Sequence, residues 1–261
     1  MTSASVPPPH LPPQGYSPAS QPLDVAALVQ VMRQMAHDMR GILAVLTTTS
    51  DMLVRGMYGE LTPQQSRASE RIQRNSSLLV NLLDDLIIFV KADANQLPLN
   101  PLPFDPRMLL AEIQKQTSPF AESKGLKLHW TVVSDLPETL VGDASLIRRI
   151  MSALLWNALG FTDAGDVWMD SSWTTEQQWV TTVRDSGPGV PAGDELKIFH
   201  PFYRGEKRPQ MPTPGFGLGL SMASRVAHLM HGRVTLEQTG PSGSTFCLRL
   251  PLLIAKSPLV P

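Results

Sequence analysis

Apolar residues recur in alternating steps of three and four along the first long amphipathic stretch of the chain. Thr49 is the only polar member of this series, which comprises Val25, Leu28, Met32, Met35, Met39, Ile42, Leu46, Thr49 and Leu53. A heptad repeat of this kind is typical of a helix that packs along its length against other helices. In this register His37 takes position f, which points into solvent, and Asp38 follows it at position g.

A second amphipathic helix is predicted after a short turn. Thr62 is a cap residue, Pro63 takes the first helical position, and Gln65 stands three after the cap. Near-heptad apolar spacing continues through Ala68, Ile72, Leu79, Leu82, Leu86 and Phe89. Residues 23–96 are therefore predicted to form an antiparallel helical hairpin. One hairpin cannot cover its own seam, so we expect a homodimer that forms a four-helix bundle through residues 23–96. A simple coiled-coil spacer is the alternative.

Proline marks the borders of the predicted domains. Residues 1–22 are rich in proline and serine and are predicted to be a disordered tail. Prolines at 98, 101, 103 and 106 indicate a linker over residues 97–106. Helices are expected at 107–117, 144–159, 194–199 and 218–230, and strands at 126–133, 167–173, 179–185, 233–237 and 245–250. This alternation predicts an α/β two-layer sandwich over residues 107–251, followed by a C-terminal tail, 252–261.

Composition narrows the classes of function. The 261 residues are 42% hydrophobic, which supports more than one core, and the net charge of -1 gives no reason to expect a nucleic-acid partner. The single cysteine, Cys247, rules out an internal disulfide and is expected to be a buried, inert thiol. The sequence contains neither a membrane span nor a secretory signal, so we expect a cytoplasmic protein. We expect no sensory domain before the first helix, and we therefore expect the input to come from a separate sensor protein.

Two groups of residues are suited to phosphoryl chemistry. The carboxylate of Asp38 can orient the ring of His37 and take a proton from it, which leaves the other ring nitrogen free to attack phosphorus. Gly215-Phe216-Gly217-Leu218-Gly219 leads into a predicted helix, where free backbone amides favour anions. Its spacing is neither that of a Walker loop nor that of a dinucleotide fingerprint. A pair of histidines, His228 and His231, can share a helical face as a metal site, but interaction with the helix dipole is the simpler explanation.

These groups occur in the order found in one family. The phosphoacceptor box is His37-Asp38-Met39-Arg40. After it come Asn157-Ala158-x-x-Phe161-Thr162, Asp185-x-Gly187-x-Gly189, Phe199-x-x-Phe202-x-Arg204, the glycine trio, and Ser242-Gly243-Ser244-Thr245-Phe246. The chain thereby resembles two-component sensor histidine kinases over residues 23–250. The resemblance implies a Bergerat-type ATP-binding fold shared with gyrase, heat-shock chaperones and mismatch-repair ATPases.

The resemblance also implies ATP and Mg²⁺ as cofactors. Asn157 would be the metal ligand, and Asp185 would accept a hydrogen bond from the adenine amino group. Gly187 and Gly189 would line the base pocket, and Arg204 would reach the terminal phosphate from a mobile lid. The remaining nucleotide-binding positions would be Gly215, Gly217, Leu218, Gly219 and Thr245. His37 and Asp38 would be the catalytic pair, and the phosphoryl group would pass to an aspartate in the receiver domain of a response regulator.

Five positions depart from the family pattern, one of which is Arg233 in place of the second glycine of the usual His-Gly-Gly after the last helix. Gly41 replaces the threonine or asparagine that positions water for dephosphorylation, and Ile42 replaces the proline that commonly follows. Ala153 replaces the first asparagine of the asparagine box, and Gly160 replaces its lysine. We therefore expect a slow kinase without phosphatase activity by that route. The alternatives are a catalytically inactive dimeric adaptor or histidine phosphotransferase, and, ranked lower, a Bergerat-type ATPase or serine kinase of the anti-sigma-factor class.

Overall fold

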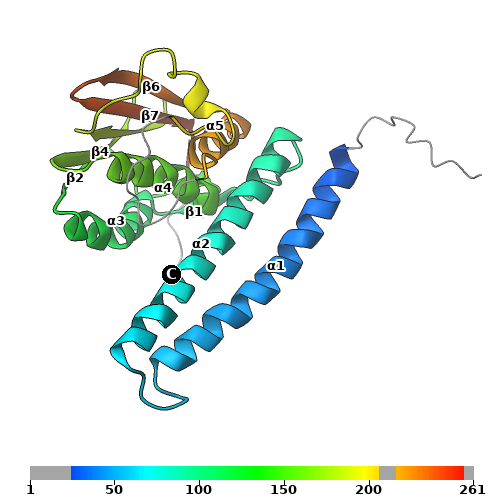
Figure 1. Ribbon diagram of the computed structural model, residues 1–261. Coiled ribbons are helices and arrows are strands. Elements are labelled where there is room, and N and C mark those ends of the chain that lie inside the picture. Colours follow the sequence, from blue (N-terminus) through cyan, green and yellow to red (C-terminus); the bar gives the residue numbers. More distant parts are fainter. Residues whose placement is uncertain (1–24, 206–215, 256–261) are drawn as a thin grey trace, which may run out of the picture.

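The computed structural model describes residues 25–205 and 216–255 (Figure 1). The predicted N-terminal tail, part of the predicted lid and most of the predicted C-terminal tail therefore lie outside the described residues. Within the described part, a helical hairpin is followed by an α/β domain that packs against one of its two helices. None of the described helices combines the length and apolarity required to cross a bilayer.

The hairpin consists of α1 (Val25–Val54) and α2 (Pro63–Asp93). The predicted start of α2 is confirmed, because the Thr62 hydroxyl accepts the backbone N–H of Gln65 and the Gln65 side chain accepts the backbone N–H of Thr62 at 2.9 Å. This reciprocal cap satisfies amides that would otherwise lack partners at the helix terminus. It determines where the chain leaves the turn and enters the second helix.

The two helices meet along a stripe that differs from the predicted seam. The contact buries Ala36 and Leu43 of α1 against Leu83 and Ile87 of α2. The predicted seam residues are exposed instead, with exposed fractions of 58% at Met35, 40% at Met39, 65% at Ile42 and 45% at Leu46. Each buried residue of α1 directly follows a seam residue, so the two stripes have the same period and differ by one step, about 100°, around the helix. The stripe that faces α2 has the predicted period, but the sequence analysis did not predict which residues of α1 it contains.

The α/β domain is built on a five-stranded sheet in the order β2-β4-β5-β7-β6. Strand β2 is parallel to β4, whereas all other neighbours are antiparallel. The strands are β2 (Lys127–Val132), β4 (Asp166–Trp173), β5 (Gln178–Asp185), β6 (Arg233–Gly240) and β7 (Gly243–Pro251). The helices that cover one face are α3 (Pro106–Ser123), α4 (Ala144–Phe161) and α5 (Gly219–Leu229) (Figure 1). The predicted two-layer sandwich is confirmed.

The core of this domain lies between the helices and the inner face of the sheet. Helix α4 is its centre, because Ile147, Ile150 and Leu154 are fully buried. They pack in one cluster with Met169 of β4 and Phe246 of β7. The position of α4 therefore depends on apolar burial, which leaves its other side available for polar side chains.

A second, three-stranded sheet was missed by the sequence analysis. It has the order β1-β3-β8 and consists of β1 (Leu102–Phe104), β3 (Leu140–Gly142) and β8 (Leu253–Ile254). Strand β1 lies inside the predicted linker 97–106 and β8 lies inside the predicted tail 252–261, so the folded domain extends beyond both predicted borders. Pro103 is tolerated in β1 because this strand is at the edge of the sheet, where a missing N–H disturbs no inner ladder.

Two predicted helices differ in extent. Helix α3 continues to Ser123 and contains Pro119, whereas the sequence predicted that it ends near 117. The helix predicted over 194–199 is a single 3₁₀ turn, η1 (Lys197–Phe199). The shorter element leaves the backbone from 200 to 205 free to approach the start of α5.

Candidate functional site

The first site residue, Asp185, ends β5 with a carboxylate that is only 5% exposed. Its Oδ1 accepts the backbone N–H of Gly187 at 2.8 Å, and the backbone N–H of Ser244 also donates to this carboxylate. Burial raises the pKa of Asp185 above its ordinary value, and the two backbone hydrogen bonds oppose that rise. A buried carboxylate that keeps acceptor capacity is suited to bind an exocyclic amino group.

The glycine turn after Asp185 is held between two other elements. A side chain at Gly187 would put its Cβ 2.9 Å from the carbonyl oxygen of Phe161, at the end of α4. Gly189 has φ +76°, and its Cβ would lie 2.1 Å from the carbonyl oxygen of Gly240, at the end of β6. Because these two positions lack side chains, the backbone of the turn can lie close to the end of α4 and to the end of β6.

The second glycine cluster is joined to the aromatic box that precedes it. The backbone N–H of Phe202 donates to the carbonyl of Gly217 at 2.9 Å, and a Cβ at Gly217 would lie 2.5 Å from the carbonyl oxygen of Tyr203. Helix α5 begins at Gly219, directly after the buried Leu218. The first amides of α5 are therefore presented next to the aromatic box, in an arrangement that favours an anion.

Helix α4 brings the asparagine box to the same place. Ala153 faces the start of α5, because a Cβ at Gly219 would meet the Ala153 methyl group at 3.7 Å. Asn157 is one turn further along α4, and its half-buried side chain forms no hydrogen bond with the described residues. The Asn157 amide oxygen has no partner among the described residues and would be able to hold a Mg²⁺ ion, which would supply positive charge for phosphate oxygens.

These contacts connect four of the five sequence motifs of the α/β domain at one edge of the sheet. The fifth motif, which contains Ser244, contacts Asp185 through the backbone N–H of Ser244. Thr245, selected by the sequence analysis, is directly opposite Arg184 in the ladder, and its part in nucleotide binding stays a prediction. Ser244 is the residue that contacts Asp185. This contact uses the backbone N–H of Ser244, so the type of residue at this position gives no signal for it in the sequence.

Two predicted positions are at the limit of the described residues. Arg204 is exposed and lies shortly before the segment that begins at 206. Gly215 is inside that segment and thus outside the described residues.

The phosphoacceptor box lies in the middle of α1. The backbone of His37 is helical, but its side chain is outside the described part of the chain, so its predicted outward direction stays a prediction. Asp38 is exposed, and its Oδ1 accepts a hydrogen bond from the Gln34 side chain at 3.0 Å. Arg40 is directed toward α2, where its Nε donates to Asp84 at 2.9 Å.

A lysine from elsewhere in the chain reaches the end of α4. Lys124 follows α3, and its Nζ donates to the carbonyl oxygens of Leu159 at 2.9 Å and Thr162 at 2.7 Å. These bonds place a positive charge beside Gly160, the position at which the family has its lysine. The charge serves as a cap for the last carbonyls of α4. The sequence offered no signal for it, because Lys124 is far from Gly160 in the chain.

The two remaining sequence candidates are the Cys247 thiol and the pair His228 and His231. Cys247 is buried in β7, and burial together with Glu237 raises the pKa of its thiol to about 11, so the predicted inert thiol is confirmed. His228 lies in the last turn of α5. Among the described residues, no group of three histidine, cysteine, aspartate or glutamate side chains is placed to hold a metal ion.

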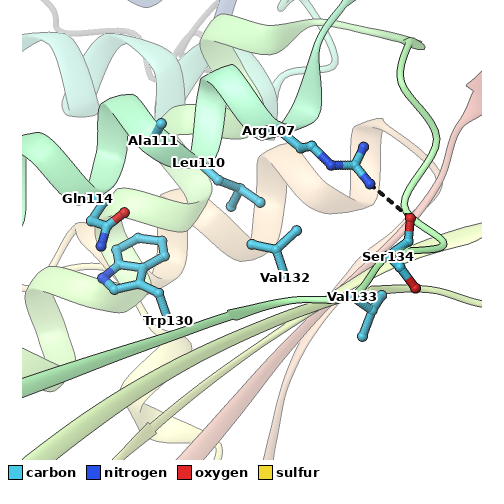
Figure 2. Close-up of a pocket in the computed structure, with 8 residues that line it drawn as sticks. All are labelled: Arg107, Leu110, Ala111, Gln114, Trp130, Val132, Val133 and Ser134. Atoms are coloured by element: carbon cyan, nitrogen blue, oxygen red, sulfur yellow. Dashed lines mark hydrogen bonds between the residues drawn. The ribbon is translucent and has the colours of Figure 1, made fainter.

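A pocket of about 290 Å³ lies between α3 and the edge strand β2 (Figure 2). Leu110 and Gln114 of α3 face Trp130 and Val132 of β2 across it. The indole N–H of Trp130 is buried without a partner among the described residues. None of the residues that line this pocket belongs to the five boxes, so it is separate from the candidate site.

Both parts of the chain match known families. Residues 27–95 match the family described as "His Kinase A (phospho-acceptor) domain". Residues 142–254 match the family described as "Histidine kinase-, DNA gyrase B-, and HSP90-like ATPase". The first match covers the hairpin, and the second begins at the last residue of β3.

Curated relatives and solved structures agree with these matches. Sensor protein TorS of Escherichia coli (strain K12) is 32% identical over 227 residues, which cover 86% of this chain and 24% of TorS. Sensor histidine kinase RcsC of Salmonella typhimurium is 30% identical over 225 residues, which cover 86% of this chain and 23% of RcsC. The crystal structure of full-length ShkA in complex with AMPPNP has a TM-score of 0.71 and 27% identity, covering 88% of this chain and 47% of ShkA. The chain thus spans about a quarter of the length of TorS and RcsC.

Proposed function

The chain belongs to the family of two-component sensor histidine kinases, and we propose that it transfers the terminal phosphoryl group of ATP to His37. The observation that carries the proposal is the convergence of Asp185, the glycine turn, Asn157 and the start of α5 on one edge of the α/β domain. That domain is joined to a helical hairpin that contains the His37-Asp38 pair.

Each residue has a defined part in the proposed reaction. Asp185 accepts a hydrogen bond from the adenine amino group, and the amides at the start of α5 bind phosphate oxygens. Asn157 holds Mg²⁺, which neutralises charge on the phosphates when it is bound. One ring nitrogen of His37 attacks the terminal phosphorus while the bond to the ADP oxygen breaks. Asp38 takes the proton from the other ring nitrogen.

The direct test is labelling with γ-labelled ATP and magnesium. Wild-type protein is expected to acquire acid-labile label, and His37→Gln is expected to lose it, because the glutamine amide cannot act as the nucleophile. His129→Gln is the matched control, since His129 pairs with Asp166 at 2.6 Å on the sheet, outside the site. Label that persists in His37→Gln would contradict the assignment of the phosphoacceptor.

We also propose that two copies form a four-helix bundle through their hairpins. Met35, Met39, Ile42 and Leu46 form an exposed apolar stripe on α1, and Ile72 and Leu79 of α2 are exposed as well. A stripe this long is costly to leave in water, and a second hairpin covers it.

Ile42→Glu is expected to weaken the dimer by at least about 100-fold, because dimerisation would bury an unpaired charge. Analytical ultracentrifugation over a concentration series measures the change. Thr48→Glu adds the same charge at an exposed position of α1 outside the stripe and is expected to leave the dimer intact. A dimer of unchanged affinity in Ile42→Glu would show that another surface holds the copies together.

The further steps rest on the family pattern. We propose that phosphorylated His37 passes its phosphoryl group to an aspartate in the receiver domain of a response regulator. Dephosphorylation of that partner through residue 41 is not expected, because Gly41 offers no side chain to position water. A cytoplasmic location and an input from a separate sensor protein stay predictions.

A non-enzymatic adaptor is the second candidate. The observation that favours it is the pair of replacements at Ala153 and Gly160, with Lys124 donating to backbone carbonyls at the end of α4. The labelling experiment separates the two functions, because an adaptor would bind ATP without acquiring label on His37.

A further inference from the structure

The pocket between α3 and β2 has polar groups at each of its two ends. Its volume of about 290 Å³ is near the lower limit for sites that bind small molecules. Arg107 and Ser134 lie at one end, and Gln114 and Trp130 lie at the other (Figure 2). Arg107 and Gln114 are both in α3, and their positions in the helix separate the two ends by about 10 Å.

The middle of the pocket is apolar. Leu110 of α3 and Val132 of β2 lie between the two polar ends (Figure 2), and Ala111 also lines the pocket. Ala111 is exposed, and its short side chain leaves space beside α3. Strand β2 is at the edge of the five-stranded sheet, so no other strand of that sheet lies on its outer side. A ligand with an apolar body therefore fits between the helix and the strand.

Arg107 has a positive charge that forms no ion pair among the described residues. Its guanidinium donates to two backbone carbonyl oxygens, that of Ser134 at 2.9 Å and that of Pro137 at 3.4 Å. Two carboxylates that are close in sequence bind other donors, because Asp105 accepts backbone N–H groups at the start of α3 and Asp135 accepts the Ser134 hydroxyl. A guanidinium has further N–H donors, which a carboxylate of a ligand can accept with complementary charge.

At the other end, the indole N–H of Trp130 is buried and has no hydrogen-bond partner among the described residues. A buried donor without an acceptor raises the free energy of the folded state, and an acceptor brought by a ligand would remove this cost. Gln114 lies at the same end, and its side chain is exposed (Figure 2). Because an exposed side chain can rotate, Gln114 can give way to a ligand oxygen.

We propose that this pocket binds a small carboxylate that has an apolar body and an acceptor oxygen at its far end. The carboxylate lies against Arg107, the apolar body lies between Leu110 and Val132, and the acceptor oxygen binds the indole N–H of Trp130. None of these residues belongs to the sequence motifs of the candidate site. The proposed ligand site is therefore independent of the proposed kinase function.

4-Hydroxycinnamate is a suitable probe, because its carboxylate and its phenol oxygen are at opposite ends of a planar apolar body. For a ligand of about 12 non-hydrogen atoms, we expect a dissociation constant of about 0.1 to 1 mM. NMR of the indole N–H groups of the full chain follows the titration, and Trp130→Phe identifies the Trp130 signal among the five tryptophans. A saturable shift of that signal is expected. No shift at about 10 mM probe would overturn the proposal.

Two analogues of the probe test the two ends of the pocket. The methyl ester of 4-hydroxycinnamate has no charge and is expected to bind about tenfold more weakly than the acid. Cinnamate has no phenol oxygen and is expected to bind about threefold more weakly or less. Equal binding of acid and ester would overturn the contact with Arg107, and equal binding of cinnamate and 4-hydroxycinnamate would overturn the contact with Trp130.

Arg107→Gln is expected to remove the preference for the acid, so that acid and ester bind within about twofold of one another. The ratio of the two affinities is measured because loss of the bonds to Ser134 and Pro137 would change the pocket for both probes alike. Arg148→Gln is the matched control, since Arg148 pairs with Glu112 outside the pocket. A preference for the acid that persists in Arg107→Gln would exclude Arg107 as the carboxylate-binding residue.

Ala111→Phe is expected to abolish the shift of the Trp130 signal, because the larger side chain fills the pocket. Met108→Phe adds a ring at an exposed position of α3 that does not line the pocket, and it is expected to keep the affinity of the wild type. A saturating non-hydrolysable ATP analogue is expected to leave the titration unchanged. Unchanged binding in Ala111→Phe, or displacement of the probe by the ATP analogue, would place the probe at another site and overturn the proposal.

Discussion

Asp185→Asn is expected to weaken ATP binding about 10- to 100-fold while changing the stability of the domain by no more than about 1 kcal/mol. The carboxylate of Asp185 accepts the backbone N–H groups of Gly187 and Ser244 and keeps capacity for the adenine amino group. Asparagine has a single acceptor oxygen, so its NH₂ group must face another donor. The loss of part of a hydrogen bond lowers the stability of the domain, whereas removal of the buried charge raises it, so the net change in stability is small.

Calorimetric titration with a non-hydrolysable ATP analogue measures the affinity, and thermal unfolding measures the stability. Asp170→Asn is the matched control, because Asp170 is exposed on the sheet. Equal affinities of wild type and Asp185→Asn would exclude Asp185 from adenine recognition.

Because of Asp185, we also expect the free energy of unfolding to depend on pH. Burial raises the pKa of Asp185 in the folded state above its ordinary value of 3.8, so the folded domain binds this proton more readily than the unfolded chain. The stability contributed by the protonated carboxyl is therefore present at low pH and is lost as the pH rises through the raised pKa. The difference in unfolding free energy between wild type and Asp185→Asn is expected to change in this window, immediately above pH 3.8. A difference independent of pH would contradict the raised pKa.

Gly189→Ala is expected to destabilise the α/β domain by about 3 to 5 kcal/mol. The new Cβ would lie 2.1 Å from the carbonyl oxygen of Gly240 and 2.8 Å from its carbon, and backbone atoms at the end of β6 cannot move aside as a flexible side chain can. The positive φ of +76° adds about 1 to 2 kcal/mol. Urea unfolding measures the loss.

Gly193→Ala separates the two causes. Gly193 has a similar backbone angle, φ +87°, but a Cβ there would meet nothing within 4 Å. Its substitution is expected to cost only the conformational term, about 1 to 2 kcal/mol. Equal losses at Gly189 and Gly193 would show that the loop after Asp185 moves away from β6 without cost.

The sequence by itself determined the local elements and their chemistry. Heptad spacing predicted two long helices, and the capping signals at Thr62 and Gln65 predicted where the second begins. The alternation of expected helices and strands predicted the two-layer sandwich, and the order of the five sequence motifs selected Asp185, Asn157 and the glycines as site candidates. Such signals can be read from the sequence because helix period, capping and glycine turns depend on residues close together in the chain.

Only the tertiary structure decided which surfaces meet. A heptad repeat in the sequence does not indicate which other helix its apolar residues contact. The structure shows that Ala36 and Leu43 face α2, whereas Met35 and Ile42 are exposed. The small sheet of β1, β3 and β8 joins segments that are far apart in the chain, and its short strands carry no period of their own. Ser244 beside Asp185, Lys124 at the end of α4, and Asp84 between Arg40 and Arg149 are likewise contacts across long separations. Contacts of this kind depend on how whole elements pack, and residue spacing along the chain does not encode them.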